Sequence, residues 1–149
     1  MKRPKILLTV VMIVLLVMMT SGTVMAKPIA SVTVGSVTYE LNQPIDTIDR
    51  VTAYNIAWQN VRPYVITVRL YDPGTDNYVG GGAVGQPKGQ EAKYPQNIYC
   101  VTQHLAAQFE IGRQFDVRVV LEDRNNNIIA DSGTLATITW GTASTWTAP

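Results

Sequence analysis

The sequence contains few charged residues, one cysteine and one histidine. Only 15% of its 149 residues are charged. A single Cys excludes a fold stapled by intramolecular disulfides, and one Cys with one His supplies too few ligands for a zinc site. With 46% hydrophobic residues, the composition also excludes a disordered polyampholyte.

Acidic residues are absent from the first 26 positions, and methionine is absent from all later ones. Residues 27–149 carry 9 basic and 11 acidic side chains, a net charge of 9 − 11 = −2. This balance excludes a strongly basic nucleic-acid-binding protein. The 149 − 26 = 123 remaining residues are enough for one domain with a real core.

Residues 1–26 are typical of a secretory signal peptide. A basic start precedes a 14-residue apolar run at 6–19, and Val24 and Ala26 occupy the −3 and −1 positions of a cleavage site before Lys27. The alternative is a retained anchor helix, although the run is shorter than the roughly 20 residues that span a bilayer. We expect cleavage and a secreted protein, extracellular or periplasmic, with no membrane span afterwards.

The composition of residues 27–149 predicts an all-β fold. This part contains 13 Val, 10 Ile and 13 Thr against 5 Leu, 4 Glu and 3 Lys. Branched side chains favour strands, and strong helix formers are scarce. Alternating segments separated by turn residues predict about seven strands in a single antiparallel β-sandwich, with candidates at residues 32–41, 51–60, 64–70, 77–84, 96–102, 114–122, 127–130 and 134–140.

The first candidate strand changes its apolar phase midway. Val32 and Val34 have one parity, Val37 and Tyr39 have the other, and the change falls at Gly35. Either the strand pairs first with one sheet and then with the other, or it contains a β-bulge.

A pattern near the middle of the domain resembles the E–F corner and F strand of immunoglobulin-like and fibronectin-type-III-like modules. Its residues are Leu105, Ile111, Gly112, Phe115, Val117 and Val119. The resemblance implies an immunoglobulin-like β-sandwich and carries no functional residue with it. Phe115 has no hydroxyl, so the hydrogen-bonded tyrosine corner of such modules cannot form here.

Catalytic and metal-binding groups are few. Cys100 and His104 lie four residues apart in a predicted strand, about 13 Å at 3.3 Å per residue, too far for a thiol–imidazole pair. Residues 123–127 match the start of a calcium loop, but Ile128 and Thr134 occupy its required Gly and Glu positions, so we expect a hairpin turn. We therefore predict no catalytic residue, no metal site and no cofactor.

Aromatic residues suggest a binding surface. Parity places Tyr54, Trp58, Phe115 and Trp140 in the core. The candidates for an exposed contact surface are Tyr78, Tyr94, Tyr99 and Trp146. The first two flank a Gly-rich stretch, residues 79–95, that we expect to form a functional loop, and we expect residues 141–149 to be a loose tail.

These observations favour an exported, non-catalytic interaction, adhesion or assembly module that binds a protein or a glycan and no nucleic acid. One alternative is a carbohydrate-binding module that uses the same tyrosines. Another is a filament or envelope subunit that donates its first strand, residues 32–41, to a neighbour. The sequence leaves the oligomeric state open.

Overall fold

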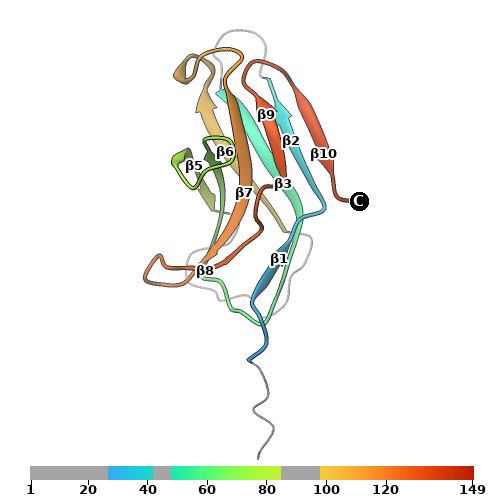
Figure 1. The fold of residues 1–149 in the computed structure, drawn as a ribbon, viewed down its shortest axis with the longest axis vertical. Helices are drawn as coiled ribbons and strands as arrows, with labels where there is room; N and C mark the ends of the chain where they lie inside the picture. Colours follow the sequence, from blue (N-terminus) through green and yellow to red (C-terminus); the bar gives the residue numbers. More distant parts are fainter. Residues whose placement is uncertain (1–26, 42–47, 85–97) are drawn as a thin grey trace, which may run out of the picture.

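The computed structural model describes residues 27–41, 48–84 and 98–149 and shows ten β-strands and one short 3-10 turn. The strands form two antiparallel sheets that face each other (Figure 1). This confirms the prediction of an all-β sandwich. The predicted signal peptide and Tyr94 lie outside the described residues.

The first sheet is built around a long central strand, β3. On one side of β3 lie β1 and β2, β10 continues the sheet beyond β2, and β6 pairs with the other side of β3. The bounds are β1 Ser31–Thr33, β2 Ser36–Glu40, β3 Ile48–Gln59, β6 Ile98–Leu105 and β10 Ser144–Thr147. Residues 31–40 thus pair within their own chain, whereas the filament alternative would donate them to a neighbour.

The second sheet has the order β5, β4, β7, with β8 and β9 pairing with opposite ends of β7. The bounds are β4 Val65–Tyr71, β5 Tyr78–Val84, β7 Gln114–Glu122, β8 Ile128–Asp131 and β9 Ala136–Thr139. Strands β3 and β6 in one sheet, with β4 and β7 in the other, make the topology compatible with immunoglobulin-like folds.

An aromatic cluster fills one end of the core. Trp140 and Phe115 are fully buried, and the rings of Phe109 and Trp140 meet edge to face with centroids 5.0 Å apart. The indole N–H of Trp140 donates a 2.8 Å hydrogen bond to the carbonyl of Ala106, in the 3-10 turn Ala106–Gln108 that links β6 to β7. A tryptophan from the segment after β9 therefore anchors this corner, where Phe115 has no hydroxyl to do so.

The phase change in the first strand falls at Gly35, and a bulge in β3 faces it. The backbone N–H of Gly35 donates to the carbonyl of Tyr54, and Asn55 has a φ of 54° where the β3–β6 register shifts. Both β1 and β2 pair with β3 in the same sheet, so the predicted switch between sheets is wrong. The residue at position 55 also reverses the parity of β3, which places Tyr54 on the outer face. The prediction of Tyr54 in the core is therefore wrong, while Trp58 is buried as expected.

The structure has more strands than predicted. The first candidate strand is split at Val34 and Gly35 into β1 and β2, and the predicted loose tail contains β10. Trp146 lies opposite Val37 and packs partly buried against the core, which gives this terminal segment a reason to pair with β2. The first residues of the predicted Gly-rich loop belong to β5, and residues 85–97 lie outside the described residues.

Candidate functional site

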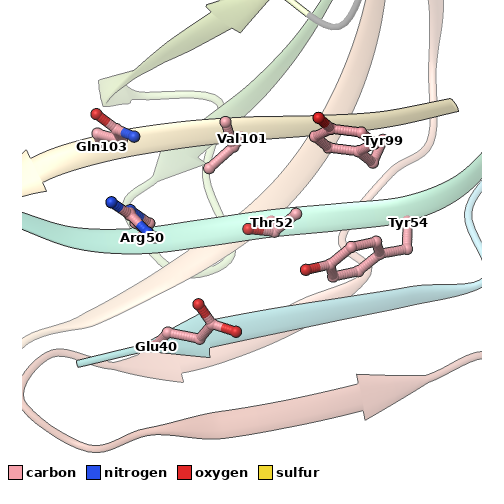
Figure 2. A pocket seen from close by; sticks show the side chains of 7 residues that line it. All are labelled: Glu40, Arg50, Thr52, Tyr54, Tyr99, Val101 and Gln103. Atoms are coloured by element: carbon pink, nitrogen blue, oxygen red, sulfur yellow. The ribbon is translucent and has the colours of Figure 1, made fainter. Parts of the chain in front are cut away.

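The outer face of the first sheet contains a hollow of about 320 Å³ across β2, β3 and β6 (Figure 2). Its volume lies in the range of small-ligand sites. The lining residues are Glu40, Arg50, Thr52, Tyr54, Tyr99, Val101 and Gln103.

Strand register brings these residues together. Arg50 lies opposite Glu40 on one neighbouring strand and opposite Gln103 on the other, which makes a polar row across three strands. Thr52 and Val101 form the next row and the middle of the hollow. Because side chains alternate along a strand, the outer parity of Arg50 and Thr52 continues to Tyr54 up to the bulge.

Tyr54 and Tyr99 form the aromatic end of the hollow. Their ring centroids are 6.3 Å apart with an angle of 32° between the planes, and the two side chains are 37% and 60% exposed. Exposed tyrosines combine an apolar ring with a hydroxyl and lose little conformational entropy on binding.

The opposite end of the hollow is polar. Within the described residues, the side chains of Glu40, Arg50 and Gln103 are all exposed and form no hydrogen bond or ion pair with one another or with other groups. A carboxylate accepts only, a guanidinium donates only, and an amide does both. This end therefore presents a full set of hydrogen-bonding groups to solvent.

A second hollow of about 450 Å³ adjoins the first through Glu40. Ser144 and Thr145 of β10 and Thr38 of β2 are among the residues that line it. The polar end of the first hollow thus continues towards the edge of the sheet over side chains that carry hydroxyl groups.

The outer face of the second sheet differs because its charged side chains are engaged inside the molecule. Glu122 forms an ion pair with Arg69, and Arg118 forms one of 2.6 Å with Asp76. Asp116 accepts hydrogen bonds from the Thr137 hydroxyl at 2.7 Å and from the backbone N–H of Gly74 at 2.8 Å. The contrast singles out the first sheet as the face with unused binding groups.

Three of the predicted contact residues, Tyr78, Tyr99 and Trp146, lie in the described part of the chain, and they do not form one surface. Of these three, Tyr99 alone lines the hollow. Tyr78 lies on the second sheet, where its hydroxyl donates to the Gly81 carbonyl and Arg69 lies over its ring. Trp146 is partly buried and packs against the core from β10.

Six of the seven residues that line the hollow were missed by sequence reasoning: Glu40, Arg50, Thr52, Tyr54, Val101 and Gln103. The signal available was the spacing Arg50-x-Thr52-x-Tyr54, which places polar and aromatic residues on one strand face. The bulge concealed it, because extending the parity of Trp58 backwards assigns Tyr54 to the core.

Cys100 and His104 are separately buried on β6. The thiol of Cys100 lies 3.4 Å from the carbonyl oxygen of Ile66. His104 Nε2 lies 3.0 Å from the Thr102 hydroxyl and Nδ1 lies 3.3 Å from Gln108 Oε1, and burial lowers the pKa of the imidazole. These contacts join each group to other residues and do not join the thiol to the imidazole.

Residues 123–127 form a turn that Asp123 organises. Its carboxylate accepts hydrogen bonds from the side-chain amide of Asn127 and from the backbone N–H groups of Asn125 and Asn127. These bonds lower the pKa of the carboxyl, and the bond from the Asn127 side chain has the largest effect. Asn126 adopts a left-handed φ of 62°. The predicted hairpin turn is therefore confirmed. Among the described residues, no group of three or more His, Cys, Asp or Glu side chains is placed to hold a metal ion.

No helix within residues 27–41, 48–84 and 98–149 is long and apolar enough to cross a membrane. Comparison with models of protein families, with curated proteins and with solved structures found no significant match.

Proposed function

We propose that this protein is an exported, non-catalytic binding module whose contact face is the outer face of the first sheet. One observation carries the proposal: an aromatic pair and three polar side chains that have no partner among the described residues gather in a single hollow on the first sheet. Side chains held on paired strands are well positioned, because the sheet fixes their spacing.

Export is inferred from the N-terminal sequence, and the fold family from the sandwich topology. The basic start, apolar run and small residues before Lys27 favour cleavage by a signal peptidase. Two sheets with this strand order suit an immunoglobulin-like module, a class that uses its sheet faces and loops for adhesion and assembly. Cell fractionation and N-terminal sequencing of the exported protein test this part, and a mature chain that begins at Lys27 is the expected result.

A binding assay tests the contact face. The protein is expressed as the full chain, and its retention on washed cell envelopes of the producing organism is compared between wild type and the double variant Tyr54→Ala/Tyr99→Ala. We expect retention to fall by about tenfold or more, because exposed aromatic anchors dominate such interfaces.

Tyr78→Ala is the matched control, since it removes an exposed tyrosine from the second sheet. It should leave retention unchanged. If the double variant has the thermal stability of wild type and is retained equally well, the hollow is not the contact face.

A further inference from the structure

We infer that the hollow on the first sheet binds a neutral oligosaccharide of pyranose sugars, an inference that rests on the proposed function. One ring would lie against Tyr54 and Tyr99, and a neighbouring ring would exchange hydrogen bonds with Glu40, Arg50 and Gln103.

The aromatic end matches the apolar face of a sugar. A pyranose ring presents C–H groups on its faces and hydroxyl groups around its edge. The exposed rings of Tyr54 and Tyr99, 6.3 Å apart and tilted by 32°, offer adjoining apolar surfaces on which C–H faces can pack. Thr52 and Val101 lie between this end and the polar row, so the middle of the hollow stays uncharged (Figure 2).

The polar end matches the edge of a sugar. Neighbouring hydroxyls each donate and accept, so a vicinal pair can donate to the carboxylate of Glu40 while accepting from the guanidinium of Arg50. Gln103 supplies both functions from the third strand. None of the three groups must give up an internal partner within the described residues to do so.

Charge favours a neutral ligand. The hollow contains one carboxylate and one guanidinium, on directly opposed residues, so its formal charge is zero. A site for a phosphate or a polyanion would concentrate positive charge instead. The arrangement therefore favours a ligand that forms hydrogen bonds and carries no net charge.

Size and composition favour a glycan over a protein. A standard protein interface covers about 800 Å² on each partner, and its centre is depleted of charged residues. Here two charged residues, Glu40 and Arg50, line the hollow itself. From Tyr54 to Arg50 the strand advances four residues, about 13 Å at 3.3 Å per residue, a length that accommodates two or three sugar rings.

An array of immobilised oligosaccharides tests the inference. The full chain is applied to neutral cello-, chito-, manno-, xylo- and galacto-oligosaccharides, to uronic-acid-containing glycans and to sulfated glycans. We expect binding to at least one neutral series. Its affinity, measured by calorimetry with the soluble hexasaccharide, should change less than about twofold between 50 and 500 mM salt, since no net charge is matched.

Variants assign that binding to the hollow. Tyr99→Ala and Arg50→Ala should each weaken it about tenfold or more. Arg50→Lys keeps the charge but loses the planar fork, so it should also weaken binding, whereas Tyr78→Ala should not. Circular dichroism and thermal unfolding show that each variant is folded.

Three outcomes would overturn the inference: no binding to any neutral series, a preference for anionic glycans that salt abolishes, or neutral-glycan binding that the hollow variants leave intact. The first two leave the proposed function standing if envelope retention still depends on Tyr54 and Tyr99. If no retention depends on these residues, the proposed function fails as well.

Discussion

The phenolic hydroxyl of Tyr39 donates a 2.7 Å hydrogen bond to Oδ2 of Asp49. The same hydroxyl accepts a 2.9 Å hydrogen bond from the backbone N–H of Gly141, and both side chains are buried. Burial raises the pKa of Tyr39, and the neighbouring Asp49 carboxylate adds to this effect, while the Gly141 bond opposes it. Tyr39 thus remains a proton donor and links the first sheet to the segment between β9 and β10.

Tyr39→Phe should lower the free energy of unfolding by about 1–3 kcal/mol, because it removes one hydrogen bond from the buried carboxylate of Asp49 and one from the backbone N–H of Gly141. Urea unfolding at neutral pH measures the change. Tyr78→Phe is the control: its exposed hydroxyl bonds only a nearby carbonyl, and its loss should cost less than about 0.5 kcal/mol. Equal costs for the two variants would contradict a special role for Tyr39.

His104 should make stability depend on pH between about 5 and 7. Burial lowers its pKa below the ordinary value of 6.5, although the contact with Gln108 partly opposes the shift. As the pH falls below that value, the unfolded chain takes up a proton that the folded chain does not, so the free energy of unfolding decreases. The loss is complete once the pH is below the folded pKa.

His104→Gln should flatten this part of the stability curve, measured by urea unfolding at several pH values. The chain has one His, so no other imidazole can cause the effect. Parallel curves for variant and wild type between pH 7 and 5 would contradict the prediction.

The buried carboxyl of Asp116 affects stability only at lower pH. Its pKa is lowered, because its hydrogen bonds from Gly74, Thr137 and Thr134 outweigh burial, which acts in the opposite direction. Ionised Asp116 therefore contributes to the free energy of unfolding at pH values above its ordinary pKa of 3.8, and this contribution is lost only as the pH falls below that value.

Gly35→Ala should destabilise the first sheet, and Asn55→Gly should rescue it. A Cβ at position 35 would lie 2.9 Å from the Cβ of Asn55, closer than such atoms pack. We expect a cost of about 1–3 kcal/mol for the single variant. The second substitution removes the opposing Cβ from a residue with positive φ, and a double-mutant cycle of unfolding free energies measures the coupling. Additive effects would show that the two positions do not collide.

Trp146→Ala should affect stability and leave ligand binding intact. The side chain packs partly buried beside the core, so its removal should cost about 2 kcal/mol, less than for a fully buried tryptophan. Tyr99→Ala should show the reverse: weaker envelope retention and a change in unfolding free energy below about 0.5 kcal/mol. Denaturation curves and the retention assay, run on both variants, separate the two roles.

Much of the fold could be predicted because it rests on local patterns. Phe115, Val117 and Val119 alternate in the sequence and are fully buried in β7. The outer positions of β7 were less predictable: Asp116 and Glu122 are polar yet buried, because partners from distant strands cover them. These partners come from β9 and β4, which pair with β7 in the same sheet, so the contacts depend on long-range strand pairing that a local sequence pattern does not show.

The candidate site was less predictable than the fold, for a comparable reason. Tyr99 was identified because aromatic residues at the ends of predicted strands are candidates for surface exposure. Arg50, Glu40 and Gln103 come from three strands, and only the register places them in one row. Tyr54 was misplaced because one residue, Asn55, shifts the alternation of a long strand.

The facing irregularities at Gly35 and Asn55 also limit how this chain can change in length during evolution. Deleting one residue at either position would move the side chains of half a strand to the opposite face of the sheet. This would expose either Val32 and Val34 or Trp58 to water. Losing one residue from both strands together would restore a regular ladder but would turn the same side chains outward. Natural variants of this protein should therefore conserve the spacing between the two halves of each strand even where individual residues differ.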